Sequence, residues 1–150
     1  MILFRLCLFL FLLLILHPFS FAQKRGRKRF KQDTARAQRY VEAANRYNGL
    51  QKHDSAAYYY KEAGRLYAEN GLWLPSVRNY KLSGISYAKN YDDDTSWYYL
   101  EKALTYLDNL DKQTLTGLKE EEDVYLNFAH INSYLFDYYK ALEYYQKGLK

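Results

Sequence analysis

The sequence predicts an all-α fold, a right-handed α-solenoid of about three helical hairpins, from three observations. First, a frame of two aromatic residues around a small pair occurs at helical spacing in AAYYYKEAGRLY, as Tyr60, Ala63, Gly64 and Tyr67. Second, related frames stand twenty residues upstream and twenty downstream. Third, turn-forming stretches separate the copies. Helices of this kind bury their apolar stripes by stacking on similar neighbours.

Residues 1–22 have the pattern of a signal peptide. Arg5 precedes an apolar run at residues 6–16, and Ser20 and Ala22 have the small-residue spacing that signal peptidase recognises. We expect cleavage near Ala22 and export to the periplasm or the exterior. The apolar run is short for a membrane span. The cations that follow favour retention on the cytoplasmic side, so an uncleaved, membrane-anchoring leader is the alternative.

Residues 23–32 carry most of the excess positive charge. Six of the 22 basic residues lie at 24–31, whereas residues 32–150 hold 15 basic and 17 acidic residues. The folded part is therefore close to neutral, which argues against a specific nucleic-acid partner. Gly26 and the lack of apolar spacing predict a flexible tail without a stable helix. The alternative is contact with a membrane surface or another polyanion.

Residues 33–150 contain the repeated frames of the predicted domain. The structural repeat positions are Tyr40, Ala44, Tyr47, Tyr60, Gly64, Tyr67, Tyr80, Gly84, Tyr87, Tyr125, Ala129, Ala141 and Tyr145. A weaker copy uses Leu100, Ala103, Leu104 and Leu107, and a 25-residue step separates Leu100 from Tyr125. Six helical units follow, the last of them ending with the printed chain.

Turn signals predict the boundaries between these units. They occupy residues 48–54, 69–75, 90–95, 114–119 and 136–137. The expected N-caps are Asp54, Asp94 or Thr95, and Asp137, and Pro75 suits the first turn of the third helix. The acidic run at 120–123 is expected to begin the fifth helix, where the helix dipole favours negative charge.

The segment 124–150 resembles a tetratricopeptide repeat. Tyr125, Phe128 and Ala129 match the large-large-small positions of that family's first helix, and Ala141, Tyr145 and Gly148 match those of its second. The resemblance extends over residues 33–150. Asn132 departs from it because the family has an aromatic residue there, and the 40-residue hairpin departs from the usual 34.

The single 25-residue step predicts how the helices pair. Insertions collect between repeats, so we expect hairpins of helices 1 with 2, 3 with 4 and 5 with 6. The opposite phase stays open, because Gly64, Tyr67, Gly71, Ser76 and Tyr80 also satisfy the motif.

The resemblance implies a groove for a peptide or protein segment on the first helix of each hairpin. Transferred through the matched frames, its candidate residues are Gln38, Val41, Asn45, Asn48, Arg78, Lys81, Ile85, Lys89, Asp123, Leu126, His130 and Tyr134. Amides, three cations and a few apolar positions would suit an extended segment with an acidic residue near its middle. The alternative is that these are ordinary solvated positions.

The motifs do not predict catalysis, a cofactor or a metal. The carboxylates of YDDDT (91–95) are adjacent, whereas calcium loops alternate their ligands. The histidines lack partners at ligand spacing, and the only cysteine, Cys7, lies in the leader. Most of the 18 tyrosines follow the repeat frame and are expected to pack. Off-frame rings that remain free for binding are Tyr58, Tyr91, Tyr98 and Tyr134.

The sequence therefore predicts an exported, non-enzymatic scaffold that binds a protein or peptide segment. The alternative is the N-terminal sensor or dimerisation region of a longer bacterial signalling protein, either a histidine kinase or a transcription regulator. A third possibility follows from the absence of a polar capping helix before Lys150: an array cut off mid-helix would self-associate through its uncapped sixth helix.

Overall fold

The chain is described by a computed structural model, which defines the backbone of residues 2–110, 115–134 and 137–149. Side chains are described for residues 26–110, 119–133, 137 and 139–149. The chain divides into two compact units, Met1–Asp33 and Thr34–Lys150. The side chains of the predicted leader, residue 114 of one predicted turn and residue 136 of another lie outside the described residues.

The first unit is helical throughout its described backbone. Its helix, α1 (Ile2–Gly49), includes the basic residues 24–31, where the sequence predicted no stable helix. That prediction was wrong because Lys and Arg are good helix formers, and one glycine costs only about 1 kcal/mol. All side chains from Gly26 to Gln32 are exposed, and Arg29 Nε lies 3.5 Å from an Asp33 carboxylate oxygen.

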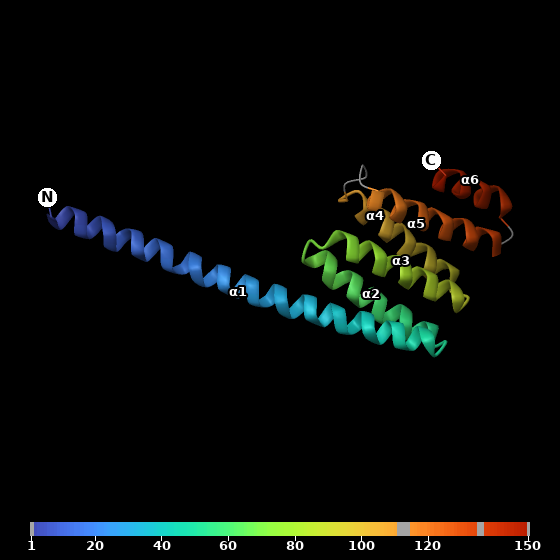
Figure 1. Cartoon of the computed structure of the whole chain (residues 1–150), viewed down its shortest axis with the longest axis horizontal. Coiled ribbons are helices and arrows are strands. Elements are labelled where there is room, and N and C mark those ends of the chain that lie inside the picture. Colours follow the sequence, from blue (N-terminus) through green and yellow to red (C-terminus); the bar gives the residue numbers. More distant parts are fainter. Residues whose placement is uncertain (1, 111–114, 135–136, 150) are drawn as a thin grey trace. The chain divides into compact units, whose positions relative to one another are not determined.

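The second unit contains the end of α1 and five further helices within the described residues (Figure 1). These are α2 (His53–Glu69), α3 (Trp73–Lys89), α4 (Asp93–Leu107), α5 (Leu115–Tyr134) and α6 (Tyr138–Gly148). Consecutive helices α2, α3 and α4 pack side by side, as do α5 and α6. The predicted all-α fold and six helical units are confirmed. No helix in the described part is long and apolar enough to span a membrane.

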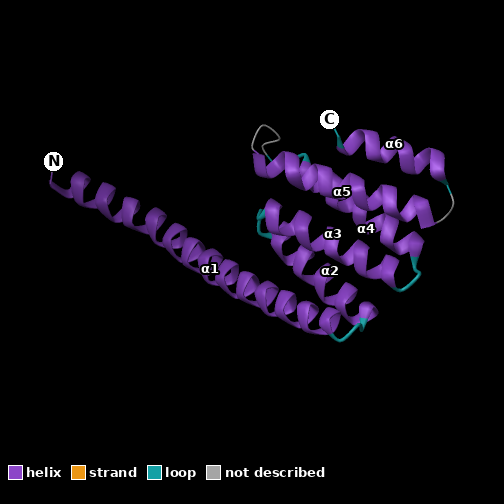
Figure 2. Cartoon of the chain, turned by 45° about the vertical axis from the view of Figure 1, so that its right-hand side comes forward, coloured by secondary structure: helices purple, strands orange, loops and turns teal. Residues whose placement is uncertain are grey.

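Three connections have one backbone design (Figure 2). The carbonyls of Tyr47, Tyr67 and Tyr87 each accept a hydrogen bond from the amide five residues later, at 2.9–3.0 Å. Between them stand Gln51, Gly71 and Tyr91, with φ of 58°, 70° and 61°. This is the Schellman ending, in which a left-handed residue lets the chain reverse. The twenty-residue period therefore fixes the turns as well as the helices.

The helix starts agree only in part with the predicted caps. Asp137 accepts a hydrogen bond from the Lys140 amide, as predicted. Asp92 caps α4 by accepting from Thr95, whereas Asp94 or Thr95 was expected; Lys52 occupies the N-cap position of α2 and Asp54 lies in its first turn. Asp54 and Asp94 still lie where the dipole favours negative charge. Pro75 lies in the first turn of α3, as predicted.

Small residues receive the large side chains of the following helix. A Cβ placed on Gly64 would lie 3.2 Å from the Tyr80 ring, and one on Gly84 would lie 2.9 Å from Leu100 Cγ. Both pairs are sixteen residues apart. Ser76 and Ser96 donate to the carbonyls of these two glycines at 3.0 and 2.7 Å. The glycines are thus the notches that the frame predicted.

A contact between two tyrosine rings recurs at one spacing along the chain. Tyr40 lies 5.7 Å from Tyr59, Tyr80 lies 6.1 Å from Tyr99, and Tyr125 lies 6.4 Å from Tyr144, measured between ring centroids. Each pair is nineteen residues apart and joins an odd helix to the following even helix. On α3, nineteen residues after Tyr60 of α2, stands Asn79, so the same pair of rings does not join α2 to α3. This recurrence agrees with the predicted hairpins α1–α2, α3–α4 and α5–α6.

The largest core cluster lies between the second and third hairpins. Tyr80, Leu100 and Phe128 are each no more than 1% exposed within it, and Trp97 packs its ring edge-on against Phe128 at 4.7 Å. The outer helix α6 is covered on one side only: Tyr139 and Leu142 are 92% and 56% exposed. The fifth helix, α5, packs against α3, α4 and α6.

Candidate functional site

The residues of the predicted groove lie on the three odd helices, α1, α3 and α5, that begin the hairpins. Five are exposed: Gln38, Asn45, Arg78, Lys89 and His130. Five others are partly exposed: Val41, Asn48, Ile85, Asp123 and Leu126. Lys81 is buried, and the side chain of Tyr134 lies outside the described residues. Ten of the twelve candidates are therefore accessible to a ligand to some degree.

The twelve candidate groove residues are called the row. One of its positions, occupied by Asn45, Ile85 and His130, has a tyrosine hydroxyl beside it in two of the three hairpins. The Tyr60 hydroxyl of α2 donates to Asn45 Oδ1 of α1 at 2.6 Å. Eighty residues plus the five-residue insertion later, the Tyr145 hydroxyl of α6 lies 3.5 Å from His130 Nδ1 of α5. In the middle hairpin the corresponding residues are Ile85 and Leu100. The row therefore presents an amide, an aliphatic side chain and an imidazole, one from each hairpin.

The hydrogen bond to Asn45 sets the direction of its amide. Burial raises the pKa of Tyr60 above its ordinary value, so its hydroxyl remains a proton donor at neutral pH. Because the Asn45 oxygen accepts this bond, the NH₂ group of the same amide is turned away from Tyr60. Gln38 is held similarly, since the Tyr67 hydroxyl donates to its Oε1 at 3.3 Å. Two amides of α1 thus have a fixed orientation.

A cluster of four charged groups joins α3 to α5. Lys81 Nζ lies 3.0 Å from both Glu120 and Asp123, and Arg78 Nε donates to Glu120 at 2.6 Å. The Lys81 and Glu120 side chains are only 11% and 7% exposed, whereas Arg78 is half exposed. The two cations and two carboxylates balance, so the cluster has no net formal charge.

This cluster corrects two expectations. Lys81 was expected to be exposed, but it is buried and paired with carboxylates forty residues along the chain. The acidic run at 120–123 was expected to begin the fifth helix, but α5 begins at Leu115 and Glu120 lies more than one turn inside it. Pairing between distant helices is not visible in a local pattern, which is why the sequence suggested a dipole interaction instead.

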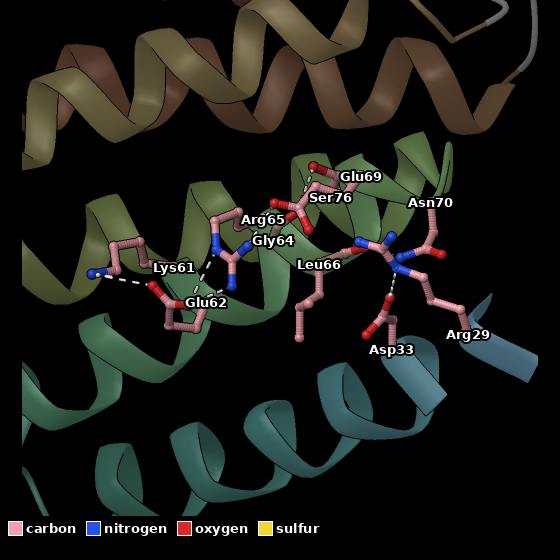
Figure 3. Close-up of polar contacts among 10 residues, drawn as sticks. All are labelled: Arg29, Asp33, Lys61, Glu62, Gly64, Arg65, Leu66, Glu69, Asn70 and Ser76. Carbon is pink, nitrogen blue, oxygen red and sulfur yellow. Dashed lines mark hydrogen bonds and ion pairs between the residues drawn. The ribbon is translucent and has the colours of Figure 1, made fainter. Parts of the chain in front are cut away.

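The even helices present a different surface. Tyr58 on α2 and Tyr98 on α4 are 50% and 53% exposed, and each packs edge-on against the neighbouring ring of Tyr59 or Tyr99. Tyr91, in the α3–α4 turn, is also exposed, so these three off-frame rings are accessible as predicted. Glu62 and Arg65 of α2 form the ion pairs drawn in Figure 3, which also shows the Ser76–Gly64 hydrogen bond.

The described residues contain a cavity but no cluster of metal-ligating side chains. Within them, no group of three His, Cys, Asp or Glu side chains is arranged to hold a metal ion. A cavity of about 260 Å³, which the sequence did not predict, lies between α4 and α5 and is lined by Leu104, Thr105, Leu107, Asp108, Glu121 and Tyr125. It lies at the five-residue insertion, where the regular spacing of the helices is broken.

Comparisons with protein-family models, with curated proteins and with solved structures found no match for this chain. The class of protein that the fold defines is therefore an all-helical domain of six consecutively packed helices, and its function has to be argued from its own residues.

Proposed function

We propose that residues 33–150 form a tetratricopeptide-like, right-handed α-solenoid that binds a protein or peptide segment and catalyses no reaction. Support for the repeat comes from the ring pair found in all three hairpins and from the glycine notches that admit the next helix. Hairpins that are built alike stack into an array with an extended surface, and such arrays bind extended ligands.

The observation that carries this proposal is the support of the α1 amides by buried tyrosines. An exposed Asn or Gln normally loses rotamer freedom when a ligand binds. Here the hydroxyls of Tyr60 and Tyr67 already hold Asn45 and Gln38 through their oxygens. The NH₂ group of Asn45 is therefore oriented before the ligand arrives, whereas that of Gln38 donates to Glu42 at 3.4 Å. A donor oriented in advance is how a rigid receptor limits the entropic cost of binding.

The chemistry of the row defines the class of ligand. Asn45 offers an oriented donor for a backbone carbonyl, Ile85 offers a partly exposed apolar contact, and His130 offers an exposed imidazole. Lys81 is neutralised by Glu120 and Asp123, and Arg78 is paired with Glu120, so among the three candidate cations a preference for an acidic ligand rests on Lys89. We propose an extended segment with a small apolar residue at its centre, flanked by polar groups.

Export is part of the same proposal. The leader pattern supports cleavage near Ala22, which would place the domain in the periplasm or outside the cell. Amino-terminal sequencing of the purified protein would give Gln23 as the first residue. Recovery of the intact leader in the membrane fraction would replace export with the anchored alternative.

The binding proposal is tested by selecting peptides from a random displayed library against the full chain and measuring their affinity by calorimetry. The informative variant is Ile85→Glu, which places a charge at the centre of the row. It should weaken binding of the selected peptides at least tenfold. The control is Tyr98→Glu on the even-helix surface, at a side chain more exposed than Ile85, and it should leave the affinity unchanged.

Circular dichroism would establish that both variants keep their helical content. Loss of binding in Tyr98→Glu, with Ile85→Glu unaffected, would transfer the site to the even helices. Loss of binding on changing Lys61 and Arg65 of α2 would support the same conclusion. A library that yields no peptide dependent on either surface would contradict the binding function.

A further inference from the structure

The basic segment at residues 24–31 has no part in the proposed groove. It contains six cations within eight positions and no acidic residue. The described side chains Arg27, Lys28 and Arg29 are all exposed on α1, and the side chain of Arg29 is 84% exposed despite its pairing with Asp33. The rest of the chain after residue 31 is nearly neutral. The positive charge is therefore concentrated in one short segment.

The helical conformation makes that concentration dense. A helix rises about 1.5 Å per residue, so eight positions span roughly 12 Å, about half the length of the same residues in an extended chain. This length is comparable to the screening distance of about 8–10 Å at moderate salt. An anionic surface therefore interacts with the segment as a single multivalent patch rather than as separate charges.

The residues that precede the patch indicate what it contacts. The apolar run at residues 6–16 belongs to the same helix α1 and ends only eight positions before Lys24. While the leader is attached, apolar insertion and the clustered cations together hold the chain on an anionic membrane, because either signal alone gives weak attachment. After the proposed cleavage near Ala22 the cations remain and bind more weakly by themselves. Nucleic acid would use the cations but not the apolar run.

We propose that residues 24–31 bind the chain to the surface of a bilayer that contains anionic lipid. The contact is electrostatic, made by the Lys and Arg side chains of this segment with lipid phosphates, and it is independent of the groove. Each cation near such a surface contributes on the order of a fivefold increase in binding, since about 1 kcal/mol is typical per residue. Its strength should fall as salt screens the charges.

The test uses the full chain and flotation with vesicles of two compositions. One is phosphatidylcholine alone, and the other contains about 30% phosphatidylglycerol, an arbitrary but convenient charge density. The variant Arg27→Gln/Lys28→Gln/Arg29→Gln removes three exposed cations. A matched control, Arg39→Gln/Lys52→Gln/Lys119→Gln, removes three exposed cations from the second unit. Both variants keep the apolar leader, so its contribution is the same in each.

The expected result is that the unmodified chain and the control bind the anionic vesicles more tightly than the neutral ones. The basic-segment variant should lose on the order of 100-fold in affinity for the anionic vesicles while keeping its affinity for the neutral ones. Raising salt to about 0.5 M should remove most of the same difference.

Two results would overturn the proposal. The first is an equal affinity for both vesicle compositions, or an equal loss in the control variant. The second is tighter binding to a duplex DNA probe than to the anionic vesicles at the same salt, which would assign the patch to nucleic acid. Failure of the peptide-binding experiment has no bearing on either result, because the groove variants leave residues 24–31 unchanged.

Discussion

The regular stack α2–α3–α4 and the junction between α3 and α5 are held together by different chemistry. In the stack, Gly64 and Gly84 admit Tyr80 and Leu100. In the junction, the ion pairs of Lys81 with Glu120 and Asp123 are added to the apolar cluster that contains Tyr80 and Phe128. The first depends on close approach of backbones, and the second on long, charged side chains.

The difference follows from the spacing along the chain. Where the twenty-residue step is kept, each small residue meets a large one sixteen positions later, and a hydroxyl can reach the glycine carbonyl. The 25-residue step before α5 breaks that correspondence. Long side chains tolerate such a change because their ends can move to meet a partner. Glycine notches thus mark the repeat, and charge pairing is added to the apolar contacts where the repeat is interrupted.

The largest expected effect is in the junction. Glu120→Ala removes the carboxylate that contacts both Lys81 and Arg78 and leaves Lys81 buried with Asp123 alone. Removing one member of a buried charged group is strongly destabilising, so the free energy of unfolding should fall by about 3 kcal/mol. Urea denaturation of the full chain would measure it.

The control for that change is Glu69→Ala on α2. Glu69 pairs with Arg65 at the surface, where its side chain is 49% exposed (Figure 3). Exposed pairs contribute about 0–1 kcal/mol, so this variant should remain close to the unmodified chain. Equal losses in the two variants would show that the junction charges are solvated rather than buried.

The second prediction concerns the notches of the regular stack. Gly84→Leu and Gly64→Leu should each lower the free energy of unfolding by about 1–3 kcal/mol because the added side chains overpack the interface. Gly84 should be the more sensitive, since its Cβ would lie closer to its neighbour and to the Ser96 carbonyl. Lys61→Leu, on a partly exposed position of α2, should change little. Harmless glycine variants in denaturant titrations would mean that the register is wrong.

A smaller effect is expected from tyrosines of the regular stack, whose ionisation makes the free energy of unfolding depend on pH. Burial raises the pKa of Tyr99 to about 12, and it also raises that of the adjacent Tyr80. Because the unfolded chain loses these protons near pH 10, stability should decrease as pH rises from about 10 to about 12. Tyr99→Phe should reduce the slope of unfolding free energy against pH. An unchanged slope would show that Tyr99 titrates normally in the folded chain.

Local patterns were sufficient to predict the repeat but not the junction. The frame around Gly64 and Gly84 implied close neighbours because small residues at helical spacing leave room for them. The cap at Asp137 and the turn after Tyr67 follow equally from nearby residues. The pairing of Lys81 with Glu120 joins positions 39 residues apart, so only the folded arrangement shows it. Lys81 therefore had the sequence features of an exposed groove residue.

The candidate row was predicted with the same limitation. Asn45 and His130 could be assigned to it from their place in the frame, but their contacts with Tyr60 and Tyr145 could not. The tyrosines were identified only as packing residues. The specific partners depend on how α1 crosses α2 and how α5 crosses α6.

The central claim is that each notch receives a particular side chain sixteen residues later, and a double-mutant cycle on Gly84 and Leu100 tests it most directly. Urea denaturation would give the free energy of unfolding for Gly84→Ala, for Leu100→Ala and for the double variant. The account predicts that Gly84→Ala destabilises the unmodified chain but costs about 1 kcal/mol less once Leu100 is truncated, because two of the three atoms nearest the new methyl group are gone and the Ser96 carbonyl oxygen remains. Additivity of the two changes within about 0.3 kcal/mol would show that these residues do not face each other, and would contradict the account.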